Sequence, residues 1–425
     1  MKKLLVVLSF FLLVYGACPS APGSNSGPSG AVNPLDFVPV TPDTENNYPP
    51  ETMADKTAFD FFRDEGLSVG WNLGNTLDAY INGKSNETGW GNPPANQSLF
   101  DGVKKAGFNV VRIPVSWMGY IGPAPDHHIQ ESYLRRVAEV AGYAHNAGFA
   151  VIINLHHDGS TDGSGKDNGW LSINKARRNE KGYNEVTHQF VRVWKQVALY
   201  FKNYGDWLMF ESFNELHDGG WGWSPESQQR PQYDIINKWN QLFTDVVRGT
   251  GANNSTRYLV IPGYCTTPKH TLASYFKLPE DSAPGKQVVT FHYYDPYEFG
   301  ILGDQQGGRH TWGSASDKQK VDTDFKPFKA KFIDNSIPVI LGECGAVLQL
   351  YPGNKSKEDQ ARQNRLDYLA HIFSKASEYG IVPIYWDNGA ATGNGEKFGL
   401  FNRRTGEPGS DESNDCIKAM INAVK

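Results

Sequence analysis

The chain has 425 residues, a formal net charge of −5 and 20% charged residues. This length allows one large barrel or about two to three smaller domains. The slightly acidic balance argues against a nucleic-acid partner, which requires a basic surface. The chain also has 11 tryptophans and 13% aromatic residues. Exposed aromatic rings of this kind suit contacts with a neutral ligand.

The first eighteen residues have the pattern of a signal segment. Residues 1–3 include two lysines. Residues 4–15 form an apolar run that is too short to span a bilayer. Small residues precede Cys18, as in a bacterial lipoprotein signal whose cysteine is lipidated. An ordinary secretory signal is the alternative. Both predict a secreted or cell-surface protein. A lipid anchor on Cys18 is the only contact with a membrane that we expect.

Residues 19–50 are rich in Pro, Gly, Ser and Asn, and are expected to form a linker. Residues 51–425 have a globular composition and are expected to fold as one domain, with a monomer as the expected state. The remaining three cysteines show no CxxC or zinc pattern. They are therefore expected to be buried free thiols, and they are Cys265, Cys344 and Cys416.

Eight short apolar segments alternate with helical segments after the linker. The predicted strands are Leu67–Thr76, Asn109–Val115, Ala150–His157, Leu208–Glu215, Arg257–Tyr264, Val288–Tyr294, Ile337–Cys344 and Ile381–Asn388. The predicted helices include Gln97–Ala106, Ile129–Ala147, Val186–Tyr204, Gln232–Gly249 and Lys357–Tyr379. Continuous apolar strands indicate a parallel sheet that is covered on both faces. The alternation predicts an α/β fold, a (β/α)8 barrel.

Polar and aromatic side chains gather at the carboxyl ends of the predicted strands. They are Trp71, Asn75, Arg112, His156, His157, Asn214, Glu215, Tyr264, His292, Tyr294, Glu343, Trp386 and Asp387. In a barrel these strand ends converge on one face, where active sites lie. Residues distant in the sequence are therefore expected to be neighbours.

Glu215 and Glu343 are the strongest candidates for chemistry, because each follows or ends an apolar strand segment. Cleavage of a glycosidic bond needs an acid, and a retaining enzyme needs a carboxylate nucleophile about 5 Å away. A structural glutamate paired with an arginine is the alternative for either residue alone. Arg112 and Tyr294 are expected to keep the nucleophile ionised. Asn214 is expected to hold the sugar 2-hydroxyl.

Seven ordered motifs together resemble glycoside hydrolase family 5, the cellulase A family, and most of all its endoglucanase and xyloglucanase branch. The motifs are GWNLGNTLDA (70–79), RIPV (112–115), NLHH (154–157), FNE (213–215), FHYY (291–294), LGE (341–343) and YWDN (385–388). The resemblance implies retaining, endo-acting hydrolysis of β-1,4-glucan without a cofactor, with Glu215 as acid/base and Glu343 as nucleophile. It also implies active-site roles for Arg112, His156, Asn214, His292, Tyr294 and Trp386.

Aromatic rings and polar side chains near the strand ends are expected to contact the polysaccharide. Trp386 is the expected platform beneath the sugar at the cleavage point, and Trp90 is the preferred further platform. Asn75 and Asp387 are expected to bind sugar hydroxyls, and His157 to bind substrate or to orient a neighbour. Other loop tryptophans are weaker candidates, namely Trp170, Trp221, Trp223 and Trp312.

Three alternatives remain at this point. A β-mannanase or another β-1,4-glycanase would have the same fold, since related polymers offer similar ring faces. A surface lipoprotein could bind glycan without cutting it. The Asp158–Gly169 loop, expected to be a solvated active-site loop, lacks the EF-hand spacing. The third alternative is a metal-dependent hydrolase that would use His156, His157 and Asp158, whereas the favoured hypothesis involves no metal.

Overall fold

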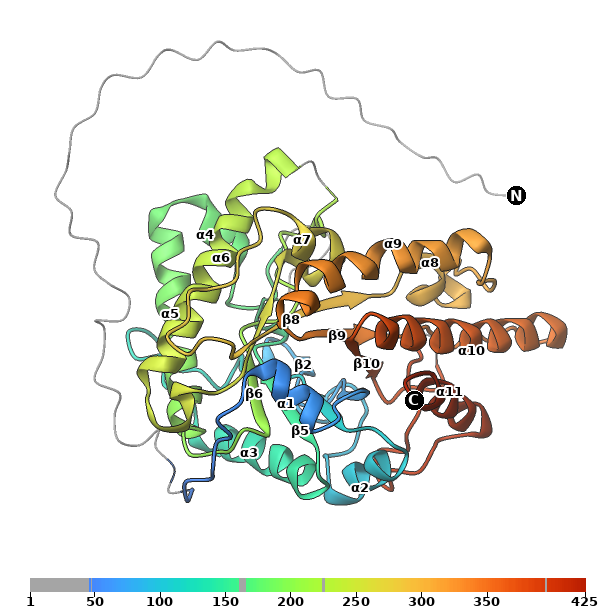
Figure 1. The fold of residues 1–425 in the computed structure, drawn as a ribbon, viewed down its shortest axis with the longest axis horizontal. Helices are drawn as coiled ribbons and strands as arrows, with labels where there is room; N and C mark the ends of the chain where they lie inside the picture. Colours follow the sequence, from blue (N-terminus) through green and yellow to red (C-terminus); the bar gives the residue numbers. More distant parts are fainter. Residues whose placement is uncertain (1–45, 47, 160–165, 224–225, 394–395) are drawn as a thin grey trace, which may run out of the picture. The chain divides into compact units, whose positions relative to one another are not determined.

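Parallel strands close into a barrel at the centre of the computed structural model (Figure 1). The model describes residues 46, 48–159, 166–223, 226–393 and 396–425. Within them, the eight barrel strands are β1 (Gly70–Leu73), β4 (Val110–Ile113), β5 (Ala150–Asn154), β6 (Leu208–Glu211), β7 (Leu259–Pro262), β8 (Gln287–Tyr293), β9 (Val339–Cys344) and β10 (Ile381–Asp387). Neighbours in this order pair in parallel, and β10 pairs back to β1. The predicted (β/α)8 barrel is confirmed.

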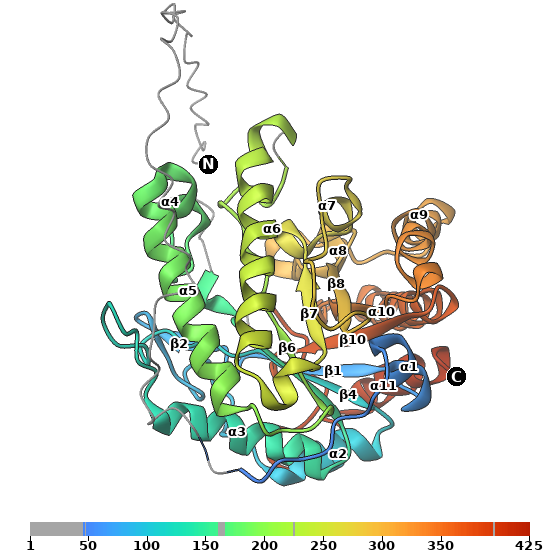
Figure 2. The same cartoon turned by 60° about the vertical axis from the view of Figure 1, so that its left-hand side comes forward.

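Helices surround the strands on the outside of the barrel (Figure 2). The longer ones are α2 (Gln97–Lys105), α3 (Glu131–Asn146), α5 (Glu180–Tyr200), α6 (Glu226–Gly249), α9 (Ala315–Lys331), α10 (Lys355–Glu378) and α11 (Asp411–Ala423). Shorter ones are α1 (Ala58–Asp64), α4 (Ile173–Arg178), α7 (Pro268–Leu272) and α8 (Tyr297–Gly300). A small hairpin, β2 (Tyr80–Ile81) with β3 (Lys84–Ser85), follows β1.

Local sequence signals set where several helices begin and end. The side chains of Asn96 and Asn354 cap the first turns of α2 and α10 by accepting backbone N–H groups. Gly107, Gly148 and Gly380 lie just after α2, α3 and α10 with φ values of 111°, 86° and 75°. Only glycine adopts this left-handed backbone without strain. The predicted helix ends before β4, β5 and β10 are therefore confirmed.

Two apolar layers pack against the barrel wall. The larger one lies between the strands and the helices. The smaller one fills the amino-terminal half of the barrel interior with Val110, Ile152, Met209, Val260, Val288, Ile340, Val382 and Ile384, and α1 covers it with Ala58, Phe61 and Phe62. The interior becomes polar toward the carboxyl ends of the strands, starting at Arg112 and Glu211. The barrel thus has a sealed apolar end and a polar end.

The predicted signal segment, Cys18 and most of the predicted linker lie outside the described residues. Packing begins slightly before residue 51, because the Tyr48 ring stacks on Tyr204 with 4.0 Å between centroids. Among the residues with described placement, no helix is both long and apolar enough to cross a membrane. The three cysteines of the barrel are buried free thiols, as predicted.

Candidate active site

The side chains predicted to carry chemistry converge at the carboxyl ends of the strands. Six of them stand within the barrel strands β1, β4, β8, β9 and β10, and they are Trp71, Arg112, His292, Glu343, Trp386 and Asp387. The predicted third and fourth strands are too long, because β5 ends at Asn154 and β6 ends at Glu211. His156, Asn214 and Glu215 therefore project from the turns that follow these strands.

Glu343 is buried on β9 and accepts hydrogen bonds on both carboxylate oxygens. Arg112 Nη1 donates to Oε1 over 2.8 Å, and Tyr294 Oη donates to Oε2 over 3.0 Å. His156 Nε2 and His292 Nδ1 lie 3.9 and 3.6 Å from the same carboxylate. Burial raises the pKa of Glu343, while His292 and Arg112 oppose that rise. The two donors stabilise the ionised form, which suits a carboxylate that attacks as an anion.

Arg112 is fully buried and connects this carboxylate to other polar groups. Its Nε donates to Glu211 Oε2 over 2.8 Å, its Nη1 to Asn72 Oδ1 over 3.1 Å and its Nη2 to Asn214 Oδ1 over 2.7 Å. Attraction to Glu211 and Glu343 outweighs burial and raises the pKa of Arg112, so it stays a cation. Its planar array of donors fixes how Glu343 and Asn214 face the site.

Three buried residues of this network were not predicted. Glu211 Oε2 also accepts a hydrogen bond from Asn154 Nδ2 over 2.7 Å, and Asn72 Nδ2 donates to the Gly342 carbonyl over 2.9 Å. A signal for Glu211 did exist, because a charged residue within an apolar strand segment needs a buried partner. Asn72 and Asn154 carried the weaker signal of a polar residue in a barrel strand.

Glu215 lies in a different environment, half-buried after β6. Its Oε1 is 2.6 Å from His292 Nδ1. Burial raises the pKa of Glu215 to about 7, although the charges of Arg112 and His157 act in the opposite direction. Burial also lowers the pKa of His292 to about 4, so this ring is neutral at the pH where Glu215 titrates. Glu215 can therefore hold a proton near neutral pH, as a general acid must.

The two glutamates face each other across His292. One atom each of Glu215, His292 and Glu343 lie within 4.8 Å of one another. The carboxyl groups of retaining glycosidases are about 5–5.5 Å apart, whereas those of inverting enzymes are about 6.5–9.5 Å apart. The observed spacing is shorter than the inverting range and agrees with the retaining geometry.

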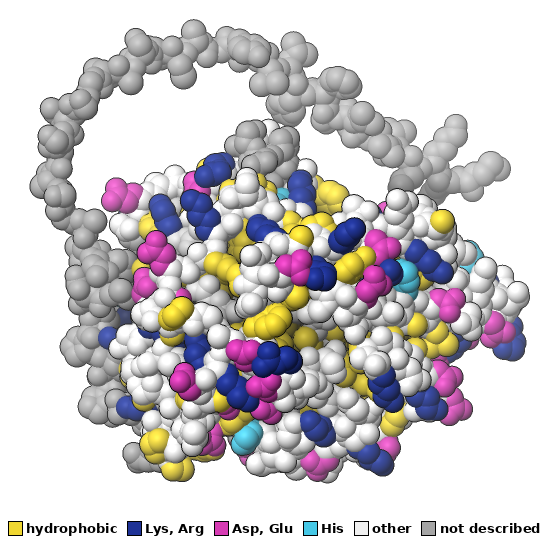
Figure 3. All heavy atoms as spheres, viewed as in Figure 1, with side chains coloured by type: hydrophobic (Ala, Val, Ile, Leu, Met, Phe, Trp, Pro, Cys, Tyr) yellow, Lys and Arg dark blue, Asp and Glu magenta, His cyan; other side chains and the backbone are white. Residues whose placement is uncertain are grey.

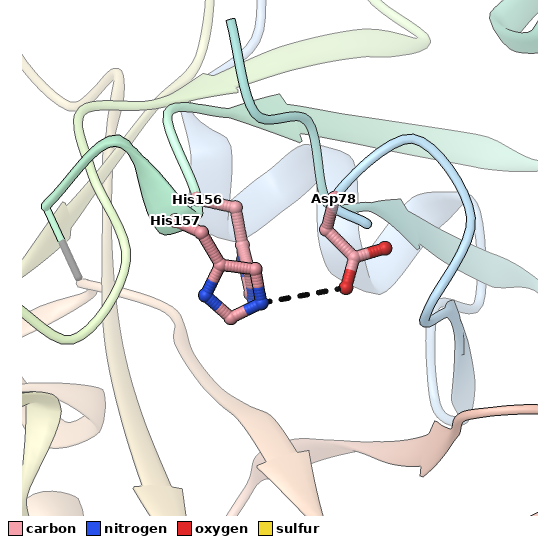
Figure 4. Close-up of side chains that lie close together, drawn as sticks. All are labelled: Asp78, His156 and His157. Atoms are coloured by element: carbon pink, nitrogen blue, oxygen red, sulfur yellow. Dashed lines mark ion pairs between the residues drawn. The ribbon is translucent and has the colours of Figure 1, made fainter. Parts of the chain in front are cut away.

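His156, His157 and Asp78 form a second group beside the glutamates. His157 Nε2 lies 3.7 Å from Asp78 Oδ2, and Figure 4 shows the His157 ring pointing toward this carboxylate. The His156 and His157 rings meet edge to face at 4.5 Å. Burial lowers the pKa of His156 well below its ordinary value, so it acts as a neutral donor or acceptor. One ligand atom from each of the three residues lies within 4.8 Å of the others, a composition that a divalent metal also accepts.

Asp158 does not lie with these histidines, as the hypothesis of a metal-dependent hydrolase required. Its carboxylate is fully buried and accepts the backbone N–H of Trp117 over 2.9 Å and the Trp170 Nε1–H over 2.7 Å. Burial raises the pKa of Asp158 to about 7. It therefore anchors the start of its loop, and part of that loop, residues 160–165, lies outside the described residues. Asp78 takes the position expected of Asp158.

Trp386 lies beside the catalytic pair with its ring parallel to His156, at 5.8 Å between centroids and 4° between planes. It packs with Val347 and Phe398. A Cβ on Gly74 would lie 2.9 Å from the Trp386 ring, so only glycine allows this ring position. The ring is held firmly in place next to the glutamates, as expected of a sugar platform.

Trp90 extends the aromatic surface on the side of the β2–β3 hairpin. Its ring is 40% exposed and lies 5.3 Å from both Tyr80 and His157. Its Nε1 donates to the Tyr80 carbonyl over 2.9 Å, which fixes the ring. Asn75 stands near this edge, with a left-handed backbone (φ 56°) and a half-buried side chain. Both positions agree with substrate contact.

The structure corrects the expectation for Asp387. This carboxylate is fully buried and accepts hydrogen bonds from Trp71 Nε1 over 3.0 Å, from the Leu400 and Gly389 backbone N–H groups, and from Arg403 Nη2. Since protein donors occupy both of its oxygens, Asp387 does not bind a sugar hydroxyl. It fixes the turn that follows Trp386.

The remaining loop tryptophans differ in exposure. Trp312 is a core residue rather than a platform, because it is 6% exposed and packs against Tyr368 at 5.2 Å. Trp221 is 43% exposed and stacks on His217 at 3.8 Å, while Trp223 is 84% exposed. Trp170 is half-buried and donates its Nε1–H to Asp158, so Trp221 and Trp223, in the loop between β6 and α6, are the most exposed of these rings.

The barrel and its paired carboxylates define a glycoside hydrolase. The cellulase model, that of glycosyl hydrolase family 5, matches residues 74–392. Endoglucanase A of Paenibacillus barcinonensis is 37% identical over 359 residues, which span 79% of this chain and 84% of that protein. The chain therefore belongs to glycosyl hydrolase family 5, as its motifs predicted.

Further relatives place the chain among glucan-degrading members of the family. A xyloglucan-specific endo-β-1,4-glucanase of Bacteroides ovatus is 32% identical, over 84% of this chain and 69% of that protein. The solved structure of a broad-specificity endoglucanase from Bacteroides salanitronis superposes with a TM-score of 0.76 at 39% identity, covering 89% of this chain and 98% of that chain.

Proposed function

We propose that this protein is a retaining endo-β-1,4-glucanase in which Glu343 is the nucleophile and Glu215 the general acid/base. The observation that carries the proposal is the contrast between two carboxylates within 4.8 Å of each other. Glu343 accepts two hydrogen bonds from Arg112 and Tyr294. Glu215 faces a neutral histidine and has a pKa of about 7. These are the environments that a nucleophile and an acid require.

In the first step, a Glu343 carboxylate oxygen attacks the anomeric carbon while the bond from that carbon to the glycosidic oxygen breaks. The Glu215 proton moves to the departing oxygen, which leaves as the 4-hydroxyl of the released chain. The products are a glycosyl ester on Glu343 and an ionised Glu215. Arg112 and Tyr294 orient the attacking carboxylate.

In the second step, ionised Glu215 takes a proton from a water molecule whose oxygen attacks the same carbon. The ester bond breaks, Glu343 returns to its carboxylate form, and Glu215 is again protonated. Two inversions give net retention of the β configuration. Asn214 supports both steps, because Arg112 occupies its Oδ1 and leaves the amide NH2 to donate to the sugar 2-hydroxyl.

The backbone polymer is proposed to be β-1,4-glucan, in the form of cellulose, mixed-linkage glucan or xyloglucan, with Trp386 beneath the sugar at the cleavage point. A β-mannanase is the alternative. Relatives include a xyloglucan-specific enzyme and a structure titled lichenase, so the same site geometry accepts more than one glucan. The exposed Trp90, Trp221 and Trp223 are proposed to contact sugars further along the chain.

A product profile tests this function. The enzyme is incubated with carboxymethyl-cellulose, barley β-glucan, xyloglucan and glucomannan, and the released oligosaccharides and their initial anomeric form are followed by chromatography and ¹H NMR. Internal cleavage with β products is expected on the glucans. Binding without release on all four would favour a glycan-binding protein, α products would contradict the retaining mechanism, and preference for mannan would replace the substrate. Loss of activity in EDTA would favour the metal-dependent reading.

We also propose that the protein is secreted or displayed at the cell surface as a monomer. The supporting observations are the signal pattern before Cys18 and the mixed charges interspersed over the face in Figure 3. Mass spectrometry of the mature amino terminus would reveal a lipidated Cys18. An unmodified terminus produced by cleavage nearby would indicate an ordinary secretory signal, and light scattering would give the oligomeric state.

A further inference from the structure

Three buried polar atoms beneath the catalytic pair have no hydrogen-bond partner among the described residues. They are Glu211 Oε1, Thr290 Oγ1 and His292 Nε2. Glu211 and Thr290 are fully buried, and His292 is 4% exposed. A buried polar atom without a partner is energetically unfavourable, so nearly all such atoms bond to protein or to ordered water. Three of them in one part of the barrel point to a shared partner.

The barrel register places Thr290 beside Glu211. Alternate strands of a (β/α)8 barrel contribute side chains to the same interior layer. Arg112 on β4 pairs with Ile152 on β5, and Ile152 pairs with Met209 on β6. Met209 precedes Glu211 by two residues. Arg112 and Glu211 nevertheless meet at 2.8 Å, so an offset of two residues relates neighbours in this layer.

The same offset leads from β6 to β8. Glu211 lies opposite Val260, and Val260 lies opposite Val288, two residues before Thr290. Thr290 is therefore placed relative to Glu211 as Glu211 is placed relative to Arg112. His292 follows Thr290 by two residues on the same face of β8 and stands above it.

Two of these atoms converge on Gly342 of β9, which has no side chain. A Cβ on Gly342 would lie 2.6 Å from Thr290 Oγ1 and 3.2 Å from His292 Nε2. The two unpartnered atoms thus approach the same bare α-carbon. The site is polar, buried and lined by several hydrogen-bonding groups, which are the conditions for a structural water.

We propose that a single water molecule binds above Gly342 and joins Glu211 Oε1, Thr290 Oγ1 and His292 Nε2. Its direction of donation follows from chemistry. Glu211 forms an ion pair with Arg112 through Oε2, and the oxygens of a paired carboxylate accept hydrogen bonds. In the proposed arrangement the water donates its two hydrogens to Glu211 Oε1 and Thr290 Oγ1, so its oxygen accepts from His292 Nε2–H. His292 is thereby held as the tautomer whose proton is on Nε2.

This tautomer determines what Glu215 meets. With its proton on Nε2, His292 presents the lone pair of Nδ1 to Glu215 Oε1 at 2.6 Å. Nδ1 therefore accepts a hydrogen bond from the protonated carboxyl group of Glu215, which stabilises the acid form. The opposite tautomer would donate to Glu215 and stabilise the anion. Thr290 is thus a positioning residue for the acid, a role that rests on the proposed assignment of Glu215.

A crystal structure of the wild-type enzyme that resolves ordered water tests the site directly. A water peak within about 2.7–3.2 Å of both Thr290 Oγ1 and His292 Nε2 is expected. In ¹⁵N-histidine-labelled enzyme, the long-range ¹H–¹⁵N spectrum should show His292 as the Nε2–H tautomer. The absence of the water, or an Nδ1–H tautomer, would overturn the proposal. Neither readout needs turnover, so both are independent of the catalytic roles.

Substitution of Thr290 tests the consequence. Thr290→Val removes the hydroxyl at similar volume, frees His292 to change tautomer, and should lower the apparent pKa of the basic limb of kcat/KM by about one pH unit. Thr290→Ser should restore the wild-type limb. An unchanged limb in Thr290→Val would overturn the role of Thr290. The other charged or titratable groups that act on Glu215 or His292 are left intact, and they are Arg112, His156, His157, Cys265, Tyr294, Glu343 and Glu396.

Two further variants separate this effect from a general loss of stability. Thr244→Val alters an equally buried threonine whose hydroxyl donates only within α6, to the Asn240 carbonyl, and should leave the limb unchanged. Gly342→Ala places a methyl group 2.6 Å from Thr290 Oγ1 and 3.2 Å from His292 Nε2, which displaces a water held by both atoms, and should shift the limb in the same direction as Thr290→Val. An opposite shift in Gly342→Ala would overturn the shared site.

Discussion

The surroundings of Glu343 and Glu215 differ although both are glutamates at the same end of one barrel. Glu343 is on a strand and accepts hydrogen bonds from a permanent cation and a phenol. Glu215 is in a turn and faces a neutral imidazole. The role of each carboxylate is therefore determined by its neighbours, because hydrogen-bond donors favour the anion while burial beside a neutral group favours the acid.

Removal of the nucleophile is the most severe way to break this contrast. Glu343→Ala should lower kcat by at least about 10⁴-fold, because no other group can form the glycosyl ester. Added azide should restore turnover and give a glycosyl azide of inverted configuration. Product analysis by ¹H NMR checks the outcome. Failure of any small anion to rescue would contradict the assignment, and Glu139→Ala on the surface of α3 serves as the control.

Removal of the acid should have an effect that depends on the leaving group. Glu215→Ala should slow hydrolysis of glucan by about 10²–10⁴-fold, since the departing oxygen is no longer protonated. The first step on a dinitrophenyl cellobioside should be nearly unaffected, because that leaving group needs no acid. Burst kinetics on the two substrates measure the difference. Equal losses on both would assign Glu215 another role.

Loss of one donor should make Glu343 more like Glu215. Tyr294→Phe removes the hydrogen bond to Glu343 Oε2, a contact to a charged group worth about 1.5–3 kcal/mol, so kcat/KM should fall by about 10–150-fold. The pKa of Glu343 should rise, so activity on the acid side should be lost at higher pH than in the wild type. A kcat/KM profile against pH tests both; an unchanged acid limb would mean that Arg112 alone keeps Glu343 ionised.

The pH profile of the wild-type enzyme tests whether Glu215 holds its proton near neutral pH. Burial raises the pKa of Glu215 to about 7. The first step needs the protonated form, so kcat/KM should fall by about tenfold per pH unit above this pKa. Below it kcat/KM should stay level until Glu343 gains a proton, which produces the acid limb. Measurement on a soluble glucan between pH 4 and about 9 tests this. A basic limb near the ordinary glutamate pKa would show that His292 does not sustain the acid form.

The smallest effect is expected at the edge of the site. Trp90→Ala should raise KM for glucan by about three- to tenfold with little change in kcat, because the ring contributes contact area but touches neither glutamate. Trp312→Ala is an informative comparison, since this buried ring should affect thermal stability rather than KM. A drop in kcat in Trp90→Ala would instead connect Trp90 to catalysis through its neighbour His157.

Much of the candidate site was predictable from the joint placement of polar residues at strand ends, because each of them alone could equally have been a structural residue. Glu215, Glu343, Arg112 and His292 were identified from residue type and order. Asp387 was misassigned, because strand-end position alone does not reveal that its oxygens face Trp71 and the following turn. The metal-dependent alternative, which grouped Asp158 with the histidines, failed for a similar reason, since Asp158 accepts a hydrogen bond from Trp117 in another loop.

The fold was predictable to a similar degree. Seven barrel strands fell within predicted segments, and β8 begins one residue before its segment, because continuous apolar runs between helices are characteristic of this architecture. The strand ends were placed too late at β5 and β6, since extended turns have the same residue pattern as strands. Helix α9 was missed, because its sequence is mostly polar and contains Pro327.

The sequence by itself determined the class of fold, the two glutamates and the family, since these depend on residue type, periodicity and order along the chain. Only the tertiary structure decided which side chain meets which. The bond from Arg112 to Glu343, the neutral contact between His292 and Glu215, and the convergence of Thr290 on Gly342 depend on barrel register. Register is set by packing across the whole barrel, and no local segment encodes it.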